Sequence, residues 1–83
     1  PNPFNPQTSI RFTLPQEHQV TLNIYNIQGQ LVKRLVDHRY DAGAHTVNWD
    51  GQDQYGQKVA SGIYIYRIQA GAFSQTRKMI LIK

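Results

Sequence analysis

The sequence predicts an all-β domain, a small antiparallel β-sandwich of about seven strands. Short runs that alternate polar and apolar residues recur along the chain, and turn-forming residues separate them about every ten positions. No long segment shows a convincing helical period. The 83 residues suffice for one hydrophobic core, and the absence of cysteine leaves that core without disulfide support.

The first strands are the clearest. Residues 1–7 contain three prolines and are predicted to be a linker, because proline fixes φ and lacks a backbone donor; the domain is predicted over residues 8–83. Ser9 to Leu14 alternates cleanly between polar and apolar residues. Val20 to Tyr25 repeats this alternation after a turn that contains Pro15.

The middle of the chain is less regular. Leu31 to Val36 fits one helical turn about as well as a strand, but its β-branched residues and flanking glycine favour a strand with a bulge at Lys33-Arg34. Ala44 to Trp49 is the next predicted strand. Residues 50–61 are rich in Gly, Asp and Gln and predict a loop, with a short strand near Lys58-Val59.

Two strong strands follow, Gly62 to Ala70 and Phe73 to Ile82, joined by a turn at Gly71. Short strands at this spacing are typical of a sandwich of the immunoglobulin-like type. In each strand, every second residue points to the same face, and the apolar set is predicted to face the core. The only tryptophan, Trp49, is predicted to lie between the sheets. The predicted core residues are Ile10, Phe12, Leu22, Ile24, Val47, Trp49, Tyr64, Tyr66 and Ile68.

The closing strand carries apolar residues on both alternation parities. Met79 and Leu81 share one face, whereas Ile80 and Ile82 share the other. A half-buried strand needs only one apolar face. Either both faces of this strand are covered, or its end is displayed for a partner, whose sheet edge it would extend by strand addition.

The net charge of +4 does not indicate nucleic-acid binding, because the nine Lys and Arg residues are scattered and no basic run interleaves with aromatics. No stretch approaches the length of a membrane span, and the start of the chain lacks a signal-peptide pattern. Because the chain begins at Pro1 without Met, we expect it to be a fragment of a longer polypeptide.

We expect no enzyme activity, cofactor or small-molecule substrate. The three histidines, His18, His38 and His45, have no shared metal-binding spacing. The five carboxylates offer no pair with an evident cleft between them, and no serine lies in a nucleophile-elbow motif.

Two binding functions are weaker alternatives. Asp50 and Asp53 superficially resemble a calcium loop, but they lack the EF-hand rhythm and fit Asx-turns better. The tyrosines and Trp49 are candidates for a sugar-stacking platform, although the parity of Tyr64 and Tyr66 favours a place in the core.

Several segments together resemble a known family. They are Pro1 to Pro6 with Ile10, Ile24 to Val32, Gly62 to Tyr64, Gly71 and Lys78. In this order they resemble the type A C-terminal sorting domain of type IX secretion cargo. The segment from Trp49 through Gly56 to Tyr64 also resembles the related immunoglobulin-like domain of flagellar hook-capping proteins. Asn26 departs from the sorting family, which often has Asp there.

The resemblance implies a C-terminal module of a secreted protein of Bacteroidetes-like bacteria, which directs an N-terminal passenger through the periplasm and across the outer membrane or to the cell surface. Its implied partners are a receptor or translocon of the secretion system and the passenger. The segments that match the family's sorting motifs are Gly62 to Tyr64, Gly71 and the end of the sequence. The implied sorting and recognition residues are Gly71, Lys78, Met79, Ile80, Leu81, Ile82 and Lys83. A structural immunoglobulin-like spacer and a carbohydrate-binding module of a glycoside hydrolase are the alternative functions.

Overall fold

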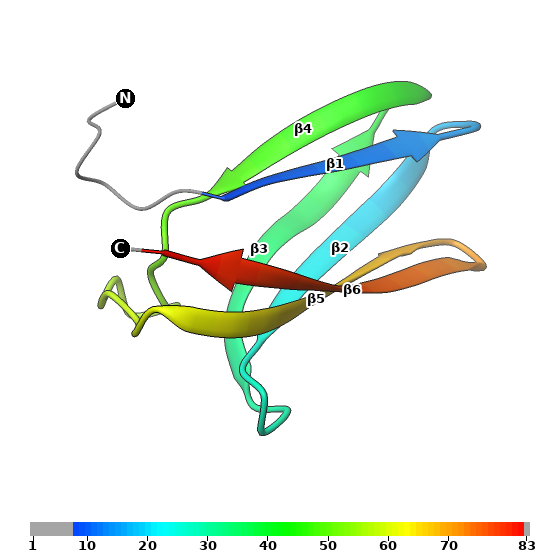
Figure 1. Ribbon diagram of the computed structural model, residues 1–83. Coiled ribbons are helices and arrows are strands. Elements are labelled where there is room, and N and C mark those ends of the chain that lie inside the picture. The colour runs from blue at the N-terminus through cyan, green and yellow to red at the C-terminus, as the bar shows by residue number, and fades with distance from the viewer. Residues whose placement is uncertain (1–7, 83) are drawn as a thin grey trace.

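The computed structural model describes residues 8–82, which form two β-sheets packed face to face (Figure 1). The predicted linker over residues 1–7 and the predicted recognition residue Lys83 lie outside this range. In chain order, the strands are β1 (Thr8–Leu14), β2 (His18–Tyr25), β3 (Leu31–Tyr40), β4 (Gly43–Trp49), β5 (Gly62–Ala70) and β6 (Phe73–Leu81).

The smaller sheet pairs β1 with β4, and the larger one has the order β3-β2-β5-β6. All paired strands are antiparallel. The β1–β4 pair covers one face of the four-stranded sheet, and no described strand covers the opposite, outer face (Figure 1). This arrangement confirms the predicted all-β sandwich.

Two segments differ from the prediction. The short strand expected near Lys58-Val59 is reduced to a single bridge between Gln52 and Lys58, so the described residues contain six strands rather than about seven. Strand β3 continues to Tyr40, four residues beyond its predicted end at Val36. The added residues are mostly polar because β3 is an edge strand of the sheet, where burial no longer imposes alternation.

The ambiguous pattern of β3 has a structural cause. The register against β2 shifts twice, once between Leu22 and Asn23 and once between Ile24 and Tyr25. The bulge predicted at Lys33-Arg34 is wrong in position, because Arg34 pairs with Asn23 and Lys33 with Ile24. The extra residues are Leu35 and Val32, one on either side of that pair. Each bulge interrupts the period of two, which explains why this run looks partly helical in sequence.

The core lies between the two sheets. Trp49 is fully buried, its ring meets that of Tyr64 edge-on with centroids 5.1 Å apart, and its Nε1 donates to the Gln52 carbonyl at 2.9 Å. Of the predicted core residues, Val47 alone is only half-buried; it packs against the core from the edge strand β4. The buried residues among those predicted are Ile10, Phe12, Leu22, Ile24, Trp49, Tyr64, Tyr66 and Ile68.

An aromatic cluster joins the two sheets at the turn between β3 and β4. Tyr40 meets Phe12 edge-on at 5.2 Å between ring centroids, and it meets His45 at 4.7 Å. His38 stacks on the other side of Tyr40 at 4.3 Å. His45 Nε2 also donates to the Asp41 carbonyl at 2.7 Å, which ties β4 to the turn. These contacts give two of the three histidines a packing role.

Candidate functional site

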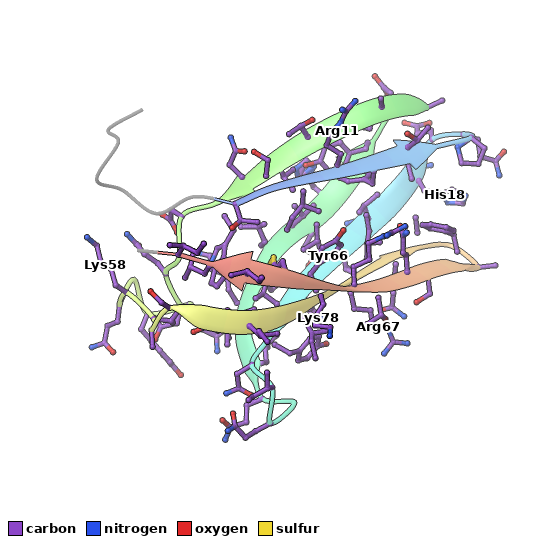
Figure 2. The ribbon with its side chains drawn as sticks, viewed as in Figure 1. Arg11, His18, Lys58, Tyr66, Arg67 and Lys78 are labelled. Atoms are coloured by element: carbon purple, nitrogen blue, oxygen red, sulfur yellow. The ribbon has the colours of Figure 1, made fainter. Side chains whose placement is uncertain are left out.

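The outer face of the β5–β6 hairpin combines exposed apolar and basic side chains. The antiparallel register sets Ile63 opposite Ile80 and Ile65 opposite Lys78. Residues of this parity point away from β1 and β4, as Figure 2 shows for Arg67 and Lys78, whereas Tyr66 points toward the core. We call this surface the hairpin face; it consists of Ile63, Ile65, Arg67, Lys78, Ile80 and Ile82.

The apolar residues of the closing strand separate cleanly by parity. Met79 and Leu81 are buried against the core, where they lie opposite Tyr64 and Gly62 of β5. Ile80 and Ile82 are 64% and 77% exposed. Within residues 8–82, only the inward parity of β6 has a sheet packed against it, so the alternative in which both faces are covered does not hold there.

This separation divides the predicted recognition residues into two groups. Lys78, Ile80 and Ile82 are available at the surface, whereas Met79 and Leu81 hold β6 in place. Ile63 and Arg67 join the first group. Ile63 lies in the segment Gly62 to Tyr64, which matches the family's sorting motifs, and the hairpin register sets it opposite Ile80. Sequence reasoning missed Arg67, because its place beside Lys78 follows only from that register.

Gly71 has a structural role of its own. It is the first residue of the two-residue turn between Ala70 and Phe73 and has φ of 60°, a value that suits glycine at the first position of a type II′ turn. A Cβ at Gly71 would lie 2.7 Å from Cε1 of His18. Glycine is needed here for backbone conformation and for packing.

The half of the outer face formed by β2 and β3 is polar and internally hydrogen-bonded. Arg34 Nε donates to the Asn23 side chain at 3.1 Å, and the same amide donates to the Tyr25 hydroxyl at 3.2 Å. Asp37 accepts from Gln19 at 3.2 Å and lies 3.7 Å from the Arg34 guanidinium. Of the exposed large apolar side chains in the strands, Ile63, Phe73 and Ile80 lie on β5 and β6, and Leu31 lies at the start of β3.

The edge of β6 is partly occupied at its far end. The start of β1 lies near the end of β6 (Figure 1), and the Thr8 hydroxyl donates to the Ile80 carbonyl at 3.5 Å. Strand addition at this edge, one form of recognition considered from sequence, would have to displace β1 near Ile80. The side chains of the hairpin face meet no such obstacle among the described residues.

The loop between β4 and β5 uses its carboxylates internally. Asp53 Oδ1 accepts from the backbone N–H groups of Tyr55 and Gln57 at 2.9 and 3.0 Å. Asp50 Oδ1 accepts from the N–H of Gln52 at 3.1 Å. These are the contacts that the Asx-turn interpretation predicts. Within residues 8–82, no three His, Cys, Asp or Glu side chains are grouped so that they could hold a metal ion.

The aromatic residues do not form one exposed platform. Trp49, Tyr64 and Tyr66 are buried, and Tyr55 stands 81% exposed on the β4–β5 loop, away from the others. Tyr64 donates its hydroxyl to the Ala60 carbonyl at 2.6 Å, and burial raises the pKa of this phenol above its ordinary value. The part of the chain that the structure describes contains no helix with the length and apolarity of a membrane span.

This geometry defines an immunoglobulin-like β-sandwich with a partly apolar, basic outer face. The chain belongs to the FlgD Ig-like domain family, which it matches over residues 4–73. The match ends at the start of β6, so most of that strand lies beyond it. The comparison with curated proteins finds no match.

Two solved structures are similar. FlgD from P. aeruginosa has a TM-score of 0.73 and 25% identity, over 90% of this chain and 58% of that chain. Dimeric latent PorU from Porphyromonas gingivalis has a TM-score of 0.72 and 24% identity, over 96% of this chain and 8% of that chain. The chain thus spans less than two thirds of either protein, and the likeness to PorU concerns the fold alone.

Proposed function

We propose that this domain is a non-catalytic sorting module of an exported protein, read by a protein receptor or translocon of a type IX secretion system. The observation that carries the proposal is the exposure of Ile80 on β6 and of Ile82 directly after it, next to Met79 and Leu81, which anchor the strand in the core. We name a type IX system because the sequence resembles the type A sorting domains of type IX secretion cargo.

The arrangement suits recognition because the strand is held rigidly while its apolar side chains stay accessible. Ile63 lies opposite Ile80 and extends the same surface. An isoleucine that a partner buries contributes about 1–2 kcal/mol, given that each is already partly shielded. A rigid surface adds little ordering cost on binding.

The proposed location follows from this role. The parent protein passes through the periplasm and is secreted or held at the outer cell surface, with its passenger preceding the domain. The second candidate function is a structural spacer or assembly domain, which membership of the FlgD Ig-like family supports. Sugar binding has less support, because the aromatic side chains do not share an exposed face.

Export of a reporter tests the proposal. A reporter that carries a Sec signal and residues 1–83 at its C-terminus is expected outside the cell only in a host with a type IX system. Retention of this fusion in the periplasm of that host would favour the spacer function. Enrichment of the fusion on insoluble polysaccharide would favour the sugar-binding function.

Point substitutions locate the recognition surface. The pair Ile80→Thr and Ile82→Thr keeps β-branched side chains but removes apolar surface, and we expect it to reduce export at unchanged melting temperature. Ile27→Thr is a matched control, because Ile27 is 65% exposed in the β2–β3 turn, outside the hairpin face. Deletion of residues 78–83 is a poorer test, since it also removes the core residues Met79 and Leu81.

A further inference from the structure

The charges of this chain are unevenly distributed along the sequence. All five Asp and Glu residues lie between Glu17 and Asp53. Residues 54–83 contain five of the nine Lys and Arg residues and no acidic residue. The net charge of +4 therefore comes entirely from the segment that contains β5 and β6.

Two of these cations lie on the hairpin face. Lys78 is opposite Ile65 and two residues before Ile80, so its side chain leaves the sheet next to the apolar residues of the hairpin face. Arg67 continues the face on β5, and its Nε lies 3.5 Å from the Ser74 hydroxyl, to which it donates. Both residues are exposed.

No carboxylate within residues 8–82 pairs with these cations. The ion pairs of this range join Arg34 to Asp37 and Arg39 to Glu17, which lie on or next to β2 and β3. Arg34 and Arg39 thus have carboxylate partners, whereas Arg67 and Lys78 have none among the described residues. Exposed charges that stay unpaired are available to a partner of opposite sign.

We infer that the hairpin face docks on a protein site that has an apolar depression for Ile63, Ile80 and Ile82 and carboxylates placed to meet Arg67 and Lys78. This inference rests on the proposed sorting function and specifies the chemistry of its receptor. The apolar contacts supply most of the affinity, and the two ion pairs fix the orientation and exclude basic surfaces.

The charge count favours a protein over an anionic membrane. Segments that bind acidic lipids by charge use clusters of about 4–8 Lys or Arg residues. The hairpin face has only two cations, Arg67 and Lys78, and the pairing of β5 with β6 fixes where they lie relative to each other. We place the contact on the side chains, since strand addition beside Ile80 would have to displace Thr8.

Charge reversal tests the inference in the export assay. We expect the double variant Arg67→Glu, Lys78→Glu to lower export of the reporter fusion at least about tenfold, as opposite charges become like charges at a docked surface. The neutral pair Arg67→Gln, Lys78→Gln should cause a smaller loss in the same direction. The matched control Arg11→Glu, Lys58→Glu makes the same change in net charge at two positions outside the hairpin face, on β1 and on the β4–β5 loop (Figure 2), and should export normally.

The outcomes separate the inference from the function on which it rests. If the unmodified fusion is not exported, the sorting function itself is wrong. If it is exported and both hairpin-face variants are exported equally well, the inferred docking chemistry is wrong. Melting curves of the purified fusions identify any variant that fails to fold. If the charge-reversed variant does not fold, export of the neutral variant Arg67→Gln, Lys78→Gln tests the inferred docking chemistry.

Lipid vesicles test the alternative that an anionic membrane binds the hairpin face. The purified fusion is mixed with vesicles of phosphatidylglycerol and phosphatidylcholine, and binding is measured by flotation. We expect no binding at physiological salt. Binding that the Arg67→Glu, Lys78→Glu variant loses and the Arg11→Glu, Lys58→Glu control keeps would show that a lipid surface occupies the hairpin face, and would overturn the inference.

Discussion

The imidazole of His18 occupies the space beside Gly71 that a side chain at that position would require. An added Cβ would approach Cε1 of His18 to 2.7 Å, and the backbone of Gly71 has φ of 60°. Gly71→Ala should lower the free energy of unfolding by about 1–2 kcal/mol, because both the left-handed conformation and the close approach penalise a Cβ. Urea denaturation of the reporter-free domain measures this change.

The steric part of this penalty can be isolated. His18→Ala removes the ring, so the double variant His18→Ala, Gly71→Ala should lose less stability than the sum of the single losses. Strict additivity would show that His18 moves aside without cost and that only the backbone conformation of Gly71 matters.

Trp49 is the largest fully buried side chain, and its indole N–H is satisfied by the Gln52 carbonyl. Trp49→Ala should cost about 3–5 kcal/mol, since it leaves a large cavity between the sheets. Thermal unfolding followed by circular dichroism measures the loss. Tyr55→Ala is the control: its side chain is 81% exposed, and its replacement should change stability by less than about 0.5 kcal/mol.

Asp53 organises the β4–β5 loop through one carboxylate oxygen that accepts two backbone N–H groups. Asp53→Ala should destabilise the domain by about 1–2 kcal/mol, as for the loss of a helix cap, which satisfies backbone donors in the same way. Asp53→Asn keeps an acceptor oxygen and should cost clearly less. Equal losses for the two variants in chemical denaturation would mean that charge, and not the acceptor, is what the loop needs.

Calcium should not stabilise this domain. The Oδ1 atoms of Asp50 and Asp53 are engaged by backbone donors, and residues 8–82 hold no group of three ligands around them. Differential scanning calorimetry should give the same melting temperature with millimolar calcium and with chelator. A rise of several degrees with calcium would revive the metal-loop hypothesis.

Tyr64 links stability to alkaline pH. Burial raises the pKa of its phenol in the folded state, so the folded protein retains this proton at pH values where the unfolded chain loses it. The associated stability is complete below about pH 10 and is lost as pH rises through the folded-state pKa. Unfolding free energies from pH 8 to 11 should therefore fall less steeply for Tyr64→Phe than for the wild type.

The strands themselves were largely predictable from sequence. Period-two alternation located Ser9 to Leu14 and Gly62 to Ala70 nearly as the structure has them, because each strand buries one face. The same rule assigned Tyr64 and Tyr66 to the core. It failed for β3, where two bulges break the period and an exposed edge removes the constraint.

Only part of the recognition surface could be predicted from the sequence. The run from Met79 to Ile82 is apolar at every position, so no pattern within it distinguishes inward from outward residues. That distinction depends on β5, because the two-residue turn at Gly71 fixes which β6 residue lies opposite each β5 residue. A β6 residue opposite a buried β5 residue points inward as well. The neighbours Ile63 and Arg67 likewise require the register.

The burial of Met79 and Leu81 bears on how the protein is made. These two residues are the last along the chain to enter the core. A ribosome delivers them after every other core residue, so a nascent copy has no closed core until its synthesis has passed Leu81. A nascent copy that ends before Met79 lacks these packing contacts and should be less stable than the domain that contains them.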